Sequence, residues 1–137
     1  MGDTLKVGIV GSRRRNTQDD KKILKEALLK LLEKTQKKNK LVELVSGGCP
    51  KGADKFAEEL AEELDLKITI HYPDKKKMRF QAYSEYARIC YERNTLIAQD
   101  SDILIAVVHK DRKGGTEDTV KKAERFGKKV VLLKCLK

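Results

Sequence analysis

The stretch VGIVGSRRR, from Val7 to Arg15, joins a continuous apolar run to a glycine-serine turn and three arginines. An apolar run without alternation is typical of a strand that is buried on both faces, as in a parallel sheet. Where such a strand turns toward a helix, free backbone N–H groups and the helix dipole favour an anion. The stretch therefore predicts the first strand of an α/β domain and a turn suited to a negatively charged group.

Four further apolar runs follow, and they alternate with helical patterns. The predicted strands are Leu5–Val10, Leu41–Val45, Ile68–Tyr72, Ile103–Val108 and Val130–Leu133. Apolar residues at helical spacing predict helices around Ile23–Leu32, Ala53–Leu64, Ser84–Gln99 and Glu117–Phe126, the last ending at Gly127. Each crossover between parallel strands must pass over a face of the sheet. We expect a single α/β domain over residues 1–137, a Rossmann-like doubly wound parallel sheet of about five strands with helices on both faces.

The composition restricts the classes of partner. The 137 residues carry a net charge of +10, which favours anionic partners without saying which anion. Cys49, Cys90 and Cys135 form no CxxC pair, so neither a disulfide framework nor a metal site is expected, and no cofactor is predicted. The chain shows no apolar run of roughly 18 residues and no signal-peptide pattern. We expect a reduced, cytoplasmic protein that does not bind membranes.

Glycines and hydroxyl residues gather where the first, second and fourth predicted strands end. Carboxyl ends of parallel strands share one edge of the sheet, and open α/β sheets bind ligands there, where the strand order reverses. Any one of these clusters is equally well explained by a tight turn, but three at one edge favour an anion site. The residues concerned are Gly11, Ser12, Arg13, Ser46, Gly47, Gly48, Lys51, Gly52, Gly114, Gly115 and Thr116.

Other charged residues have competing interpretations. Arg93 and Asn94 precede the fourth strand, where arginine would contact a phosphate or carboxylate in two places, unless it is a plain surface residue. Asp54 and Glu117 begin two helices; they either complement the helix dipole or act as acid-base groups on a ligand. For Arg14 and Arg15 a solvated turn is the simpler interpretation. His71 and His109 are interpreted as strand ends, and Lys75–Gln81 as a basic loop or lid.

The pattern excludes two common nucleotide-binding classes. Neither GxxxxGK[ST] nor a GxGxxG after the first strand occurs, so the chain is no Walker P-loop protein and no standard dinucleotide dehydrogenase.

The segments GIVGSRRR, VSGGCPKGADKFAEELA, YERNTLIAQDSDILIAV and GGTEDTVKKAERFGKKVVLL together resemble the SLOG superfamily of Rossmann-like proteins, most closely its small YspA-like group. The resemblance covers nearly the whole chain and is weakest around residues 75–83. It implies a nucleotide or nucleotide-derived ligand in the crevice, held by Gly11, Ser12, Arg13, Ser46, Gly47, Gly48, Gly52, Asp54, Arg93, Asn94, Gly115 and Thr116.

Two more distant relatives imply competing activities. Lonely Guy phosphoribohydrolases cut an N-glycosidic bond with an arginine, matched by Arg93, and a glutamate in GGxGTxxE. Here Thr119 stands at the glutamate position, so Glu117 or Asp118 would have to replace it. The DNA-processing protein A family shares an IVGSR turn and binds single-stranded DNA; the positive charge fits this, whereas only 5% aromatic residues and no tryptophan do not.

We therefore expect a protein that binds a nucleotide or nucleotide-derived ligand through phosphate-binding turns. If there is turnover, we expect hydrolysis or transfer at an N-glycosidic or phosphate bond, with Glu117 or Asp54 as the acid-base group. A single-stranded nucleic-acid-binding module is the alternative, with Tyr83, Tyr86 and Tyr91 as candidates for base stacking. An apolar face on the outermost helix could support a homodimer.

Overall fold

The computed structural model describes residues 3–49, 51–73, 83–112 and 114–134. Five parallel strands form one sheet in the order β3-β2-β1-β4-β5, which confirms the predicted α/β fold. The chain extends the sheet from β1 to β3 on one side, then crosses back and continues with β4 on the other side of β1. The strands are β1 (Thr4–Gly11), β2 (Leu41–Ser46), β3 (Lys67–Ile70), β4 (Ile103–Val107) and β5 (Lys129–Leu133).

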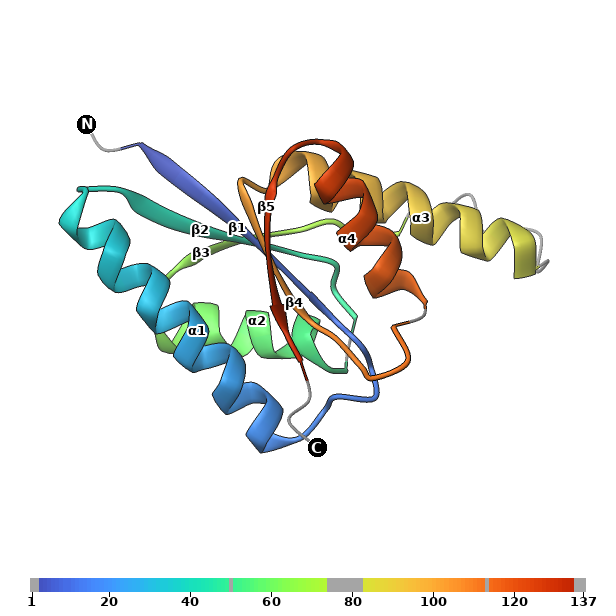
Figure 1. The fold of residues 1–137 in the computed structure, drawn as a ribbon, viewed down its shortest axis with the longest axis horizontal. Coiled ribbons are helices and arrows are strands. Elements are labelled where there is room, and N and C mark those ends of the chain that lie inside the picture. Colours follow the sequence, from blue (N-terminus) through green and yellow to red (C-terminus); the bar gives the residue numbers. More distant parts are fainter. Residues whose placement is uncertain (1–2, 50, 74–82, 113, 135–137) are drawn as a thin grey trace.

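Four helices cover the sheet, two on each face. Figure 1 shows α1 and α2 together on one side of the strands and α3 and α4 on the other. The helices are α1 (Gln18–Lys37), α2 (Ala53–Glu63), α3 (Tyr83–Asp100) and α4 (Gly115–Arg125). The described helices include none that is long and apolar enough to cross a membrane.

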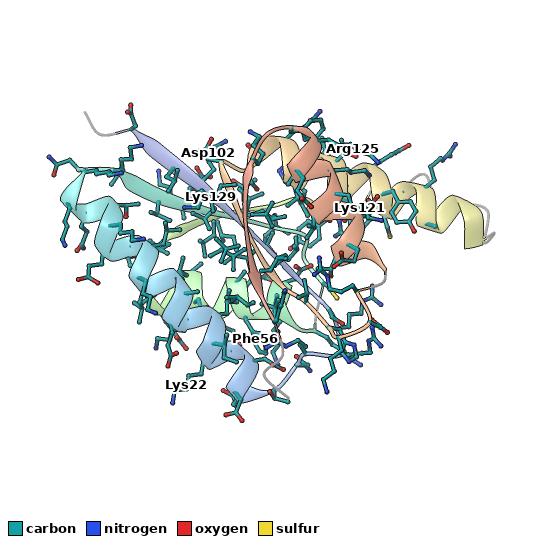
Figure 2. All side chains as sticks on the ribbon, viewed as in Figure 1. Lys22, Phe56, Asp102, Lys121, Arg125 and Lys129 are labelled. Carbon is teal, nitrogen blue, oxygen red and sulfur yellow. The ribbon has the colours of Figure 1, made fainter. Side chains whose placement is uncertain are left out.

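Alternate residues of the central strands supply two separate hydrophobic cores. Val7 and Ile9 of β1 pack with Phe56 in the core under α1 and α2, whereas Val10 packs with Ile97 in the core under α3 and α4. Figure 2 shows Phe56 on α2, within the half of the molecule that α1 and α2 cover. Because both faces are buried, the central strands read as unbroken apolar runs in the sequence.

The ends of the elements differ from the sequence prediction by a few residues. α1 begins earlier than its apolar stripe because Thr17 and Asp20 form a reciprocal capping box. α4 begins at Gly115 and ends as predicted before Gly127, whose φ of 73° suits a helix terminus. β3 ends at Ile70 rather than Tyr72. The predicted basic loop, residues 75–81, and Cys135 lie outside the described residues.

Arg15 is buried, so its interpretation as part of a solvated turn is wrong. Its side chain is 5% exposed, and its Nε donates to Asp20 Oδ1 at 2.9 Å. Nη1 donates to the carbonyls of Val108, at 3.1 Å, and Leu133. These bonds attach the turn after β1 to the carboxyl ends of β4 and β5. A buried guanidinium is tolerated because its donors find an ion-pair partner and two carbonyls.

Replacing Arg15 by Met should lower the free energy of unfolding by about 3 kcal/mol, because it removes the ion-pair partner of the largely buried Asp20 carboxylate and a donor to two strand-end carbonyls. Urea denaturation with an unchanged m-value would measure the loss. Arg14→Met is the matched control: Arg14 is 51% exposed and pairs with Asp111 at the surface, so its removal should cost less than about 1 kcal/mol. Equal losses in the two variants would contradict a structural role specific to Arg15.

Candidate functional site

A cleft of about 370 Å³ opens at the carboxyl edge of the sheet. Its walls come from the end of β1 and the turn after it, the middle of α3 and the start of α4, with Cys49 from the turn after β2. β1 and β4 are the neighbouring strands from which the chain departs to opposite faces of the sheet. The cleft therefore lies at the point where the strand order reverses, the usual ligand position in open α/β sheets.

Most of the predicted site residues line this cleft, and a smaller group does not. Ser46, Gly47, Gly48 and Gly52 are absent from the lining, and Lys51 is exposed outside it. The predicted residues that line the cleft are Gly11, Ser12, Arg13, Asp54, Arg93, Asn94, Gly114, Gly115 and Thr116.

Arg93 is positioned by the turn after β2. Its Nη1 donates to the Gly47 carbonyl at 2.5 Å, and its Nε donates to Asn94 Oδ1 at 3.0 Å. A Cβ at residue 47 would lie 2.6 Å from Arg93 Nη1 and 3.0 Å from Asp54 Oδ2, so only glycine leaves room for this approach. The guanidinium is thus held in the wall of the cleft by its own contacts.

Asn94 connects α3 to the start of α4. It is 4% exposed, and its Nδ2 lies 3.3 Å from the Gly115 carbonyl and 3.2 Å from Asp118 Oδ2. Because its amide oxygen accepts from Arg93, Asn94 aligns the arginine with the first turn of α4. The pair RN thereby joins two walls of the cleft.

The first turn of α4 presents backbone N–H groups to the cleft. Gly114 precedes the helix with φ 96° and ψ −159°, a conformation that favours glycine, and no side chain caps this end. Gly115 and Thr116 both line the cleft. Since the first N–H groups of a helix have no intrahelical acceptor, this end is suited to an anion.

Among the described residues that line the cleft, Asp54 is the only one with a carboxyl group. Its Oδ2 accepts the Cys49 N–H at 3.0 Å, so Asp54 supports the turn before its own helix. Burial raises the pKa of the Asp54 carboxyl, and the Cys49 N–H and the charge of Arg93 only partly oppose this. A carboxyl with a raised pKa beside an arginine is a candidate acid-base group.

Glu117, the other predicted acid-base residue, does not line the cleft. Its carboxylate pairs with Arg112 through contacts of 2.5 and 2.9 Å. Because Glu117 also lies in the first turn of α4, it complements the helix dipole while it holds the preceding loop.

The remaining glycines and Ser46 support the turns rather than face a ligand. A Cβ on Gly52 would lie 2.9 Å from the Ser12 carbonyl, so this glycine lets the turns after β1 and β2 meet. Its N–H donates to Asn16 Oδ1 at 2.8 Å. Ser46 is fully buried, and its hydroxyl forms no hydrogen bond of normal geometry within the described residues.

Sequence reasoning did not assign Cys49, Cys90 or Arg14 to the site, although all three line the cleft. Arg14 is held by Asp111 through two contacts of 2.7 and 2.5 Å, which lower the pKa of Asp111 to about 2. Nothing in the spacing of these residues marks them, because Arg14 and Cys49 lie in two loops at the sheet edge and Cys90 is brought to the cleft by the packing of α3.

Tyr91 also lines the cleft, and its side chain reaches the surface. It is 45% exposed, and Lys122 Nζ lies 5.6 Å from the ring centroid. Placing Tyr91 at the rim gives the cleft an aromatic surface beside its cationic wall.

No protein-family model and no curated protein matches this chain. Within the described residues no group of three histidine, cysteine or acidic side chains is arranged to hold a metal ion. The fold and the cleft define a Rossmann-like α/β protein with an anion-compatible crevice at its switch point.

Replacing Asp54 by Asn should raise the free energy of unfolding near neutral pH. The folded protein holds the pKa of this carboxyl above 3.8, the ordinary value, so ionisation weakens the fold as the pH rises through and beyond that value. The variant lacks this loss, so its advantage should grow as the pH rises above about 4 and vanish at lower pH. Urea denaturation at several pH values measures it.

The exposed Glu26→Gln on α1 serves as the control and should show no comparable pH-dependent gain. If Asp54→Asn were less stable than the parent protein across this pH range, the ionised carboxylate would be net stabilising and the argument from burial would be wrong.

Proposed function

We propose that the protein binds a nucleotide or nucleotide-derived ligand in the cleft, with a phosphoryl group between Arg93 and the first turn of α4. The observation that carries the proposal is the Arg93–Asn94 pair, which holds a guanidinium of α3 next to the N-terminus of α4 at the cleft. Arginine contacts phosphate in two places, and the free N–H groups add donors that water would otherwise satisfy. The resemblance of the four segments to SLOG proteins supports the same ligand class.

The charge of the lining favours an anion over a neutral or cationic ligand. Arg13, Arg14 and Arg93 line the cleft, and Asp54 is the one carboxyl group among the described lining residues. The whole chain carries +10, so its field also attracts anions from a distance.

Tyr91 supports a nucleotide over a simple phosphate ester. A base can stack on the exposed tyrosine ring at the rim while its phosphate reaches Arg93, because both side chains line the cleft. The ring and the guanidinium thus offer contacts to the two chemically different ends of a nucleotide.

Hydrolysis of an N-glycosidic or phosphate bond is the enzymatic form of this proposal: water attacks the sugar carbon or the phosphorus, the base or the sugar hydroxyl leaves, and Asp54 is the acid-base group that moves the proton. The raised pKa of this carboxyl and its place in the cleft support that role. Chromatography of a nucleoside monophosphate incubated with the protein separates the two forms, because an enzyme releases free base or phosphate and a binding protein returns the nucleotide intact.

Arg93→Ala should weaken the binding of a nucleoside monophosphate by at least about tenfold, since hydrogen bonds to charged groups contribute about 1.5–3 kcal/mol each. Calorimetric titration with the four common ribonucleoside monophosphates would measure the change, and thermal shifts would report it by mass action. Arg93→Lys keeps the charge and should recover only part of the affinity.

Arg88→Ala, an exposed arginine of the same helix outside the cleft lining, is the matched control and should bind as the parent protein does. Binding that survives in Arg93→Ala at full strength would remove this residue from the site. Absence of binding by the parent protein to every one of these nucleotides would overturn the proposal.

Tyr91→Ala should weaken nucleotide binding by about 1–3 kcal/mol and leave ribose 5-phosphate binding unchanged, because only the nucleotide carries a base to stack. Phe126→Ala removes another exposed ring, 44% exposed at the end of α4, and should affect neither ligand. Equal losses for ribose 5-phosphate and nucleotide in Tyr91→Ala would show that the ring shapes the cleft without contacting a base.

A further inference from the structure

Asp118 lies in the first turn of α4, contacts α3 and does not line the cleft. Its Oδ2 accepts a hydrogen bond from Asn94 Nδ2 at 3.2 Å and forms an ion pair with Lys122 Nζ at 2.8 Å. Both contacts use the same carboxylate oxygen. The position of that oxygen therefore decides what the Asn94 amide meets.

Lys122 holds this carboxylate oxygen in place. It lies four residues further along α4, its side chain is 19% exposed, and its Nζ also donates to the Tyr91 carbonyl at 2.7 Å. A lysine with one partner on each helix is more confined than a lysine in an ordinary surface pair at this spacing. Contacts to both helices thus fix the Asp118 carboxylate between them.

The Asn94 amide is satisfied in one orientation. Its nitrogen, which only donates, faces two acceptors, Asp118 Oδ2 and the Gly115 carbonyl. Its oxygen, which only accepts, faces Arg93 Nε at 3.0 Å. A half-turn of the amide would set donor against donor and oxygen against carboxylate. Asn94 is 4% exposed, so water cannot compensate for such a mismatch.

We propose that Asp118 is a positioning residue of the cleft, which acts through Asn94 to keep the Arg93 guanidinium directed at the phosphoryl group beside the first turn of α4. The inference rests on the proposed function, because the phosphoryl group belongs to that proposal. Since the Asp118 carboxylate is committed to Asn94 and Lys122 outside the cleft lining, it supports the arginine rather than acting as an acid or base on the ligand.

Positioning and charge predict opposite effects when the Asp118 carboxylate is removed. This carboxylate lies in the helix turn whose N–H groups would meet the phosphoryl group, so its negative charge by itself disfavours an anionic ligand. Neutralising it should therefore tighten binding if charge is all that matters. If the accepting oxygen orients Asn94 and hence Arg93, its removal should weaken binding instead.

Calorimetric titration with AMP and ribose 5-phosphate tests this difference. Asp118→Ala should weaken the binding of both ligands by the same factor, about three- to tenfold, which is the contribution of one hydrogen bond. The factor is the same because Arg93 binds the phosphate that both ligands carry. Asp118→Asn keeps an oxygen that can occupy the Oδ2 position, so it should bind both ligands at least as tightly as the parent protein does.

Helix α4 should stay intact in these variants, and circular dichroism would check this. Alanine is the best helix former. Asp118→Ser is the second variant that removes the acceptor: serine is well tolerated near a helix N-terminus, but its hydroxyl is too short to reach Asn94, so it should show the same loss as Asp118→Ala.

The Arg93→Ala background separates positioning from general damage to the cleft. No guanidinium is left to be oriented there, so adding Asp118→Ala should leave the AMP affinity unchanged or raise it slightly. A further loss as large as in the parent background would show an effect that does not pass through Arg93, and would overturn the inference.

Glu117→Ala is the matched control, because it removes a carboxylate from the neighbouring position of the same turn. Glu117 pairs with Arg112, and neither residue lines the cleft. The control should bind AMP at least as tightly as the parent protein, with a gain of no more than about threefold.

Two further results would overturn the inference. AMP binding by Asp118→Ala that is unchanged or tighter would show that the carboxylate acts only through its charge. Binding by Asp118→Asn as weak as that of Asp118→Ala would show that an accepting oxygen is not what matters. The proposed function survives each of these results as long as the parent protein binds AMP, whereas a parent protein that binds neither AMP nor ribose 5-phosphate would remove both.

Discussion

The site depends on one constraint of parallel sheets: where the chain leaves two neighbouring strands toward opposite faces, the two connections diverge and leave a crevice at the sheet edge. β1 leads to α1 on one face, and β4 leads to α4 on the other. Between these departures the sheet edge stays open, and the side chains of α3 and the first turn of α4 line the opening. Every property proposed for the site follows from this gap, since it brings two helix-leading turns and Arg93 together.

The turn after β1 has both structural and binding roles, which explains its three arginines. Ser12 continues the β1–β4 pairing with an N–H donated to the Val107 carbonyl at 3.0 Å, so the turn stays attached to the sheet edge. Arg15 then joins the ends of β4 and β5 through its hydrogen bonds to the Val108 and Leu133 carbonyls. These contacts hold the backbone of the turn in place. The side chains of Arg13 and Arg14 are then left to line the cleft.

The fold was predictable from the sequence, because strand burial on both faces and glycine after strands act within a few neighbouring residues. Val7 to Gly11 shows the unbroken run of a central strand, and the RN pair and the Gly-Gly-Thr turn were correctly assigned to the sheet edge. The partners of charged side chains were not predictable. Arg15 is buried because carbonyls 93 and 118 residues away need a donor, and Glu117 is occupied by Arg112 only because the loop before α4 turns back. Such choices depend on which distant groups meet, and no local pattern encodes them.

The buried carboxyl of Asp54 is less favourable for the stability of the folded protein, once ionised, than a neutral side chain would be. A buried carboxyl accepts one backbone N–H from Cys49, yet burial outweighs this bond and the nearby charge of Arg93, so the pKa is raised. A neutral amide or a small apolar residue would remove that unfavourable desolvation. Glu63 and Glu117 are paired with lysine or arginine, whereas Asp54 accepts a backbone N–H at the wall of a cleft that three arginines line, so it is the carboxyl that a ligand of the proposed class would meet. Gly47 leaves room for both Arg93 and Asp54 at the open sheet edge, since a Cβ there would lie within 3.0 Å of each side chain.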